Sequence, residues 1–144
     1  MKGHGYVRYR QHGWNWRLEF IHDKLIINRK DYMERWILRT KLFQLRLHKI
    51  ISSDDPGRPP HDHPTFLASL ILKGGYIQAV RGRPDETFTR GSFNIVPWGV
   101  AHIVTLLNEH APTWTLVFNG PKNREWGFQT DKGWVHHEDF FGFR

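Results

Sequence analysis

The 144-residue chain contains no cysteine. This absence excludes disulfide bridges, a cysteine nucleophile and thiolate ligation, so any metal must be held by histidine, carboxylate or water. No apolar run reaches the roughly 20 residues that a membrane-spanning helix needs, and the first 16 residues lack the apolar core of a signal peptide. We therefore expect a soluble, cytoplasmic protein that makes no membrane contact.

Two common catalytic patterns are also missing. The segment "LKGGY" lacks the spacing and the following helix of a phosphate-binding loop. Ser69 lies inside an apolar run, without the flanking glycines that would expose a nucleophilic serine. These absences disfavour phosphate-loop and serine-nucleophile chemistry.

Acidic residues are scarce in the first third of the chain. Residues 1–49 hold 12 of the 21 Lys and Arg but only four of the 14 Asp and Glu, a net charge of +8, whereas residues 50–144 carry a net charge of −1. Trp14, Trp16 and Trp36 are interleaved with these basic residues. Such a mixture can hold a phosphate backbone and stack bases, and it is equally typical of a solvated strand face. A nucleic-acid partner is therefore one alternative function.

Short apolar segments separated by turn residues make up the rest of the pattern. Two such segments flank a turn at residues 28–31, and residues 65–74 form an apolar strand that could pair with 76–80 across Gly74-Gly75. Only residues 30–36 have helical character. This spacing predicts one all-β domain over residues 1–144, a sandwich, jelly roll or barrel with little helix.

The pair His61 and His63 stands directly before that apolar strand. Residues i and i+2 of a strand project to the same face, about 7 Å apart at their backbones, so both imidazoles can reach one point. One strand cannot surround an ion, so a third ligand must come from elsewhere in the sheet. His102, in "GSFNIVPWGVAHIV", is the strongest candidate.

These residues resemble the two motifs of the cupin superfamily. The second motif is matched at Gly91, Pro97, Gly99 and His102, and the first at His61, His63 and Gly74 or Gly75. The resemblance implies a double-stranded β-helix, or jelly-roll barrel, with basic strands in residues 1–49 and both motifs in residues 50–144. The first motif's glutamate would fall at Leu67 or Ala68, and neither can ligate a metal.

The resemblance implies a three-histidine metal site with no carboxylate. Such sites in this superfamily occur in thiol dioxygenases and some carbon–carbon-cleaving dioxygenases, which use Fe(II), so we expect one divalent metal and favour Fe(II). Ligand type alone also admits Zn(II), Ni(II), Cu(II), Co(II) or Mn(II). The expected function is a mononuclear Fe(II)-dependent dioxygenase of a small organic substrate, with an isomerase or lyase as a variant. A ligand-binding cupin without turnover is the other alternative.

The count of residues along each strand suggests what lines the pocket. If His61 and His63 face inward, Thr65 and Ser69 share their side, and Val104 and Leu106 share that of His102, which predicts a mainly apolar cavity. On an earlier strand, Phe43, Leu45 and Leu47 share one face, and Gln44, Arg46 and His48 the other.

That polar face, with Arg46 and His48, could support a ligand imidazole or hold an anion. An exposed edge face is the alternative that we favour. Arg81, Arg83 and Arg90 could steer an acidic substrate at the pocket mouth, although solvated charges in a turn are the more common outcome. The pattern assigns no catalytic residue, and a homodimer is expected because jelly rolls have open edge strands.

Overall fold

The computed structural model describes residues 7–15, 18–121 and 124–142, with side chains from Leu18 onward. The first strands are β1 (Val7–Asn15), β2 (Leu18–Ile27), β3 (Lys30–Arg39) and β4 (Gln44–Ile50). The central strands are β5 (Leu67–Lys73), β6 (Gly75–Ala79), β7 (Glu86–Thr89), β8 (Phe93–Val96), β9 (Ile103–Leu106) and β10 (Thr113–Asn119). The chain then forms β11 (Gly127–Thr130), β12 (Gly133–His136) and the helix α1 (His137–Phe141).

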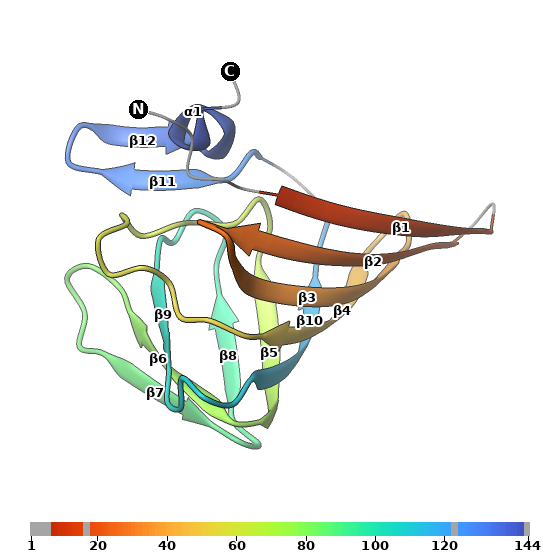
Figure 1. Cartoon of the computed structure of the whole chain (residues 1–144), viewed down its shortest axis with the longest axis horizontal. Coiled ribbons are helices and arrows are strands. Elements are labelled where there is room, and N and C mark those ends of the chain that lie inside the picture. Colours follow the sequence, from red (N-terminus) through yellow and green to blue (C-terminus); the bar gives the residue numbers. More distant parts are fainter. Residues whose placement is uncertain (1–6, 16–17, 122–123, 143–144) are drawn as a thin grey trace.

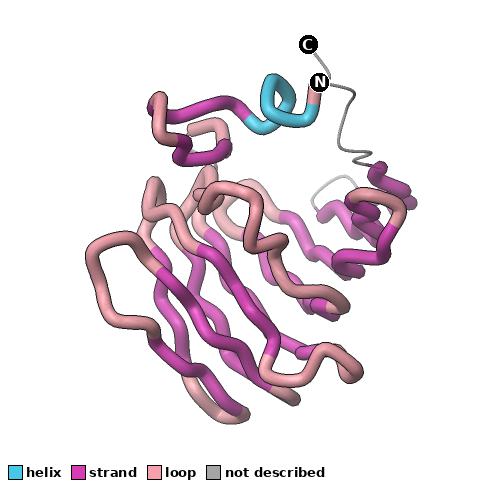
Figure 2. The backbone as a smooth tube through the Cα atoms, turned by 60° about the vertical axis from the view of Figure 1, so that its left-hand side comes forward, coloured by secondary structure: helices cyan, strands magenta, loops and turns pink. Residues whose placement is uncertain are grey.

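Two sheets face each other and a small third unit lies at one end of the pair. The seven-stranded sheet has the order β1-β2-β3-β4-β10-β5-β8, and the three-stranded sheet has the order β7-β6-β9 (Figure 1). The β11-β12 hairpin and α1 lie beyond the end of these sheets, as both views show (Figure 2). The predicted all-β jelly roll with little helix is confirmed. Strands β1 to β4, which contain most of the basic first third of the chain, belong to the same sheet as β10, β5 and β8.

The hairpin between β2 and β3 follows the sequence prediction, with longer strands. Asn28 and Arg29 both have positive φ, at 52° and 63°, which is the backbone that a two-residue hairpin turn with right-handed strand twist requires. The segment with helical character, residues 30–36, lies in β3. β3 contains Tyr32, Trp36 and Ile37, aromatic and β-branched residues that suit a half-buried strand.

Strands β5 and β6 do not pair with each other, so the expected hairpin across Gly74-Gly75 is wrong. β5 pairs with β10 and β8, while β6 pairs with β7 and β9 in the other sheet. Gly74 has a φ of 78°, and a Cβ there would lie 2.7 Å from Thr113 Oγ1. The glycine pair therefore carries the chain between sheets, through a turn that a side chain would obstruct.

The inner face of the seven-stranded sheet is more polar than the alternation suggested. Gln44, Arg46 and His48 lie opposite Asn119, Val117 and Thr115 of β10, whose side chains are buried. The outer face instead carries exposed apolar side chains, including Leu45, Phe93, Ile95 and Phe118. The favoured edge-face interpretation of Gln44, Arg46 and His48 is wrong, because the interior of this barrel encloses a polar cavity.

Two apolar clusters close the barrel elsewhere. One contains Ile50, Ile71, Tyr76, Phe88 and Leu106, and the other contains Leu67, Val96 and Val117. Neither cluster includes the histidines of the two motifs, which lie nearer the β11-β12 end. Within the described ranges, no helix has the length and apolar character needed to cross the membrane.

Candidate metal centre

His61 and His102 are held side by side through their backbones. The His61 N–H donates to the His102 carbonyl at 3.1 Å, and the His102 N–H donates back to the His61 carbonyl at 2.9 Å. Two main-chain bonds of this kind fix the distance between the two motifs, because an antiparallel bridge sets both backbones at one separation. The predicted meeting of His102 with the His61 segment is therefore achieved by the backbone itself.

Asp62, between the two histidines, points away from them and anchors their loop. Its carboxylate accepts hydrogen bonds from the Gly127 N–H at 2.8 Å and the Trp134 indole N–H at 3.0 Å, and it pairs with Arg124 at 3.1 Å. The carboxylate is buried with all of these partners. It ties the histidine loop to the β11-β12 hairpin.

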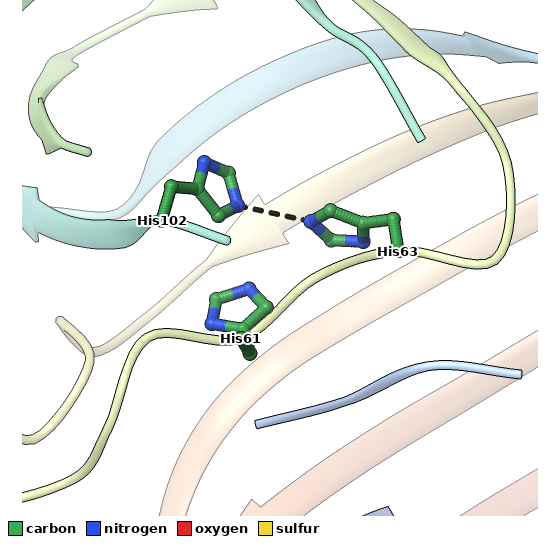
Figure 3. A group of neighbouring side chains, drawn as sticks. All are labelled: His61, His63 and His102. Atoms are coloured by element: carbon green, nitrogen blue, oxygen red, sulfur yellow. Dashed lines mark hydrogen bonds between the residues drawn. The ribbon is translucent and has the colours of Figure 1, made fainter. Parts of the chain in front are cut away.

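The three imidazole rings converge on one point, as predicted. One ring nitrogen from each of His61, His63 and His102 lies within 4.8 Å of the others (Figure 3). The Nε2 atoms of His63 and His102 are 2.9 Å apart. Two nitrogens that bind one metal at about 2.1 Å and at right angles to each other would be about 3.0 Å apart. The donor set therefore fits a single divalent metal ion, with positions left over for other ligands.

His102 is oriented by a buried amide. The Gln78 Oε1 atom lies 2.8 Å from His102 Nδ1 and also accepts a hydrogen bond from Asn94 Nδ2 at 2.8 Å. Asn94 in turn donates to the Tyr76 hydroxyl at 2.8 Å. Because the amide oxygen can only accept, Nδ1 carries the proton and Nε2 presents its lone pair to the cluster.

His61 has a carboxylate behind it. Asp54 Oδ2 lies 3.5 Å from His61 Nδ1, and the same carboxylate accepts hydrogen bonds from the Val104 N–H and the Tyr32 hydroxyl. Arg58 lies 3.6 Å from its other oxygen. Asp54 thus favours a proton on Nδ1 of His61, which leaves Nε2 of that ring for a metal.

Burial keeps His63 and His102 neutral. It lowers the pKa of His102 to about 3, and the neighbouring His61 adds to this effect while Asp54 opposes it. Burial also lowers the pKa of His63 well below its usual value, with further contributions from His102, His61 and Arg46. A metal binds the neutral imidazole, so His63 and His102 are in their binding form at neutral pH.

A cavity of about 490 Å³ adjoins the cluster. His61 and His63 line it together with apolar side chains: Leu25, Ile27, Met33, Leu67, Trp126, Phe128 and Phe141. Arg46 and His48 line it as well, so two of the predicted substrate-binding residues lie at the cavity. Leu67, at the position of the cupin glutamate, contributes only hydrocarbon.

The other four predicted substrate-binding residues do not line this cavity. Thr65 and Ser69 are buried, and the Thr65 hydroxyl donates to the Phe66 carbonyl. Leu106 belongs to the first apolar cluster and Val104 packs against it. The residue count along each strand identified the shared face correctly, but these side chains fill the barrel instead of opening onto a ligand space. The expected apolar character of the cavity is also wrong, since arginines and carboxylates line it.

The three arginines expected at the pocket mouth do not lie at the cavity. Arg81, Arg83 and Arg90 are exposed and do not line the cavity. Three other arginines, which the sequence pattern did not single out, line the cavity instead: Arg35 and Arg39 of β3, and Arg58 of the loop after β4.

A second group of donors occurs beside the β11-β12 hairpin and α1, where Glu125 and His137 line the same cavity. Nitrogen and oxygen atoms of Glu125, His136 and His137 lie within 4.8 Å of one another. His136 Nδ1, however, accepts the Glu138 N–H and its Nε2 faces Glu125 at 3.5 Å. That Nε2 therefore carries the proton in the neutral ring, which suits a hydrogen bond to Glu125 and does not suit a metal.

Two groups that support the cluster were missed at the sequence level. Gln78 lies two residues after Tyr76 in an alternating strand, so its inward position could have been inferred from Tyr76. Asp54 lies in the loop "SSDDPGR", where spacing gives no indication that a carboxylate will be buried behind His61.

No family model and no curated protein matches the chain. Among solved structures, a conserved protein with a double-stranded β-helix domain from Klebsiella pneumoniae subsp. pneumoniae aligns at a TM-score of 0.54 and 14% identity, over 67% of this chain and 84% of that one. A structure of DMSP lyases aligns at a TM-score of 0.56 and 17% identity, over 73% of this chain and 55% of that one. The iron(II) form of HppE aligns at a TM-score of 0.53 and 16% identity, over 78% of this chain and 56% of that one.

At identities of this size, the structural likeness establishes the fold alone. The chain spans little more than half the length of the DMSP lyase and HppE chains. The protein has the double-stranded β-helix fold of the cupins. Its three-histidine cluster lies inside that fold and could hold a metal ion.

Proposed function

We propose that the protein is a mononuclear metal enzyme, a non-haem Fe(II)-dependent dioxygenase that acts on a small organic substrate. The observation that carries the proposal is the convergence of three imidazoles beside a cavity of about 490 Å³. Iron(II) held by His61, His63 and His102 would supply the open coordination positions and the redox chemistry that dioxygen activation requires.

The chain's own residues have distinct roles in this proposal. Gln78 and Asp54 hold the ring nitrogens of His102 and His61 in the orientation that ligation needs. Phe128 and Phe141, both nearly completely buried, exclude water from the α1 end of the cavity. Leu67 leaves the ligand set neutral, so the metal would keep its full positive charge.

The comparison with iron(II) HppE supports an iron-dependent reaction on this fold. The likeness to DMSP lyases supports the variant in which a divalent metal acts as a Lewis acid in an elimination or isomerisation. A ligand-binding cupin without turnover is the remaining alternative.

Metal analysis of the untagged protein, purified without chelators, tests the site. We expect about one equivalent of metal in the parent and a loss of it in His61→Ala and His102→Ala. His110→Ala is the matched control, because His110 is exposed in the turn before β10. No bound metal after reconstitution with Fe(II), Zn(II) and Ni(II) would contradict the proposal.

Oxygen uptake then separates the alternatives. The anaerobically Fe(II)-loaded protein is mixed with pools of small organic compounds and then with oxygenated buffer. Substrate-dependent uptake that is lost in His102→Ala is the result expected of a dioxygenase. Product formation without uptake would assign the lyase or isomerase variant, and binding without product would assign the ligand-binding alternative.

A further inference from the structure

One wall of the cavity concentrates buried polar atoms that lack partners. Among the residues whose side chains are described, three buried side-chain nitrogen or oxygen atoms have no hydrogen-bond partner: Arg39 Nε, His48 Nε2 and Asn119 Oδ1. All three residues line the same cavity. A buried polar group without a partner costs about 1–3 kcal/mol, so three on one wall indicate a surface built to contact a ligand.

The sheet register explains why these atoms share a wall. Arg39 of β3 and Asn119 of β10 both lie opposite Gln44 of β4, one on each side. Arg46 and His48 follow Gln44 on the same face of β4. We call these five residues the arginine wall: Arg39, Gln44, Arg46, His48 and Asn119.

The wall is positively charged and lies next to the metal cluster. Gln44 Oε1 accepts hydrogen bonds from Nε and Nη2 of Arg46, which holds the guanidinium in place. Arg46 and His63 line the same cavity. Strands β4 and β10 contain no acidic residue, so the part of the wall that they form carries no negative charge.

Within the arginine wall, Arg39 Nη1 pairs with Glu19 of β2 at 3.3 Å. The other charges around the cavity also have partners. Arg35 makes a two-point contact with Asp23, at 2.8 and 2.7 Å, and Arg58 lies 3.6 Å from Asp54. Glu125, at the exposed rim, lies 3.5 Å from His136. The carboxylates that line the cavity, those of Asp54, Glu125 and Glu138, come from the loop after β4, the loop before β11 and α1, and none comes from the strands of the arginine wall.

The chemistry of the wall indicates which ligand it fits. A guanidinium matches the two oxygens of a carboxylate. Asn119 Oδ1 is an acceptor and needs a donor, such as a hydroxyl or amine on the same ligand. Three neutral ligands leave a divalent metal with two positive charges, which an anionic ligand would offset.

We propose that the arginine wall binds the carboxylate of a small hydroxy or amino acid and directs its reactive end toward His61, His63 and His102. This inference rests on the proposed function, because it places the substrate beside the metal. It adds the substrate class: a small organic acid that carries a hydrogen-bond donor near its carboxylate.

Calorimetric titration tests the proposal with defined probes. The metal-loaded protein is titrated with malate, lactate, glycerate and serine, and with the uncharged malamide as a comparison. At least one acid should bind, and malamide should bind at least about tenfold more weakly, because a hydrogen bond to a charged group is stronger than one to a neutral group.

Substitutions identify the wall as the binding surface. Arg46→Gln should weaken binding of the acid at least about tenfold. Asn119→Asp, which keeps the shape but adds a negative charge, should also weaken it. Arg83→Gln is the control, because Arg83 is exposed in a turn away from the cavity and should leave affinity unchanged. Arg46→Lys provides a second test if Arg46→Gln does not fold: it keeps the charge, loses the two-point geometry and should bind more weakly than the parent.

The outcomes distinguish the two proposals. If no acid binds the metal-loaded parent, or if Arg46→Gln and Asn119→Asp bind as the parent does, the arginine wall is not the substrate site and the proposed function stands by itself. If acids bind with the expected dependence on Arg46 but the parent holds no metal, the dioxygenase proposal fails. The wall would then remain the ligand site of a binding cupin.

Discussion

The Oε1 atom of Gln78 lies 2.8 Å from Nδ1 of His102 and determines which nitrogen of that ring faces the cluster. Without this acceptor, the neutral ring could place its proton on Nε2 and lose its ligand function. A residue in β6 that contacts no metal therefore governs the metal site. The same amide is itself held by Asn94, so the orientation depends on a buried chain of hydrogen bonds.

Removing this acceptor should weaken metal binding. Gln78→Leu keeps the side-chain volume but lacks the oxygen, and the loss of such a supporting partner typically costs 10–100-fold in metal affinity, so we expect a fall of about that size. Gln78→Glu retains an acceptor and should bind metal at least as well as Gln78→Leu does. Competition with a chromogenic chelator measures both. Equal affinity of parent and Gln78→Leu would show that Gln78 does not orient His102.

A carboxylate at position 67 should restore a fourth ligand. Leu67 lines the cavity at the place of the cupin glutamate, whereas Ala68 is paired with Phe118 on the other face of β5. Leu67→Glu should lower the melting temperature of the metal-free protein, because it buries an ionisable group. It should also enlarge the increase in melting temperature on adding Zn(II) or Ni(II). Ala68→Glu, the control, should not enlarge it.

The metal-free protein should lose stability as the pH falls. His48, His63 and His102 all have a lowered pKa in the folded state, mainly because they are buried. In the unfolded chain their pKa is about 6.5, so the unfolded state takes up protons first. The three neutral rings therefore make their full contribution to the free energy of unfolding above about pH 6.5, and this contribution declines at lower pH. For His102 the decline continues down to its pKa in the folded state, about 3.

Urea unfolding of the metal-free protein between pH 7.5 and 4.5 measures this dependence. The free energy of unfolding should decrease steadily over that interval, and His48→Gln should make the decrease shallower because it removes one of the three groups. A stability that does not change with pH would contradict the neutral state of these rings.

The turn at Gly74 should tolerate no side chain. Gly91 and Gly74 both have positive φ, at 86° and 78°, but a Cβ at Gly91 would meet nothing within 4 Å. Gly91→Ala should therefore cost about 1–2 kcal/mol from the backbone alone. Gly74→Ala should cost more, because its Cβ would also lie 2.7 Å from Thr113 Oγ1. Chemical denaturation of the two variants gives the comparison, and equal losses would remove the steric part of this explanation.

Two expectations about partners stay predictions. The homodimer can be tested by sedimentation equilibrium of the metal-loaded protein. Nucleic-acid binding by the basic first third can be tested by the salt dependence of oligonucleotide affinity. Arg35, Arg39 and Arg46 all line the cavity, so these basic residues of the first third are directed inward.

The sequence by itself determined the features that depend on spacing along one chain. The spacing of His61 and His63 placed both rings near one point, and the second motif identified His102 as the third member of the cluster. Alternation in "LFQLRLH" also predicted which side chains share a face. These relations are local, because the geometry of a strand or turn is set by a few consecutive residues.

Only the tertiary structure decided which face of each strand lies inside. The alternation of apolar and polar residues is the same whether Arg46 or Leu45 points inward. In the structure Arg46 lines the cavity and Leu45 is exposed on the outer face. Spacing also gave no sign that Gln78 would contact His102 or that Asp54 would support His61, since 24 and 7 residues separate the members of each pair. Those contacts exist because separate strands and a loop pack together, and packing is set by the whole fold.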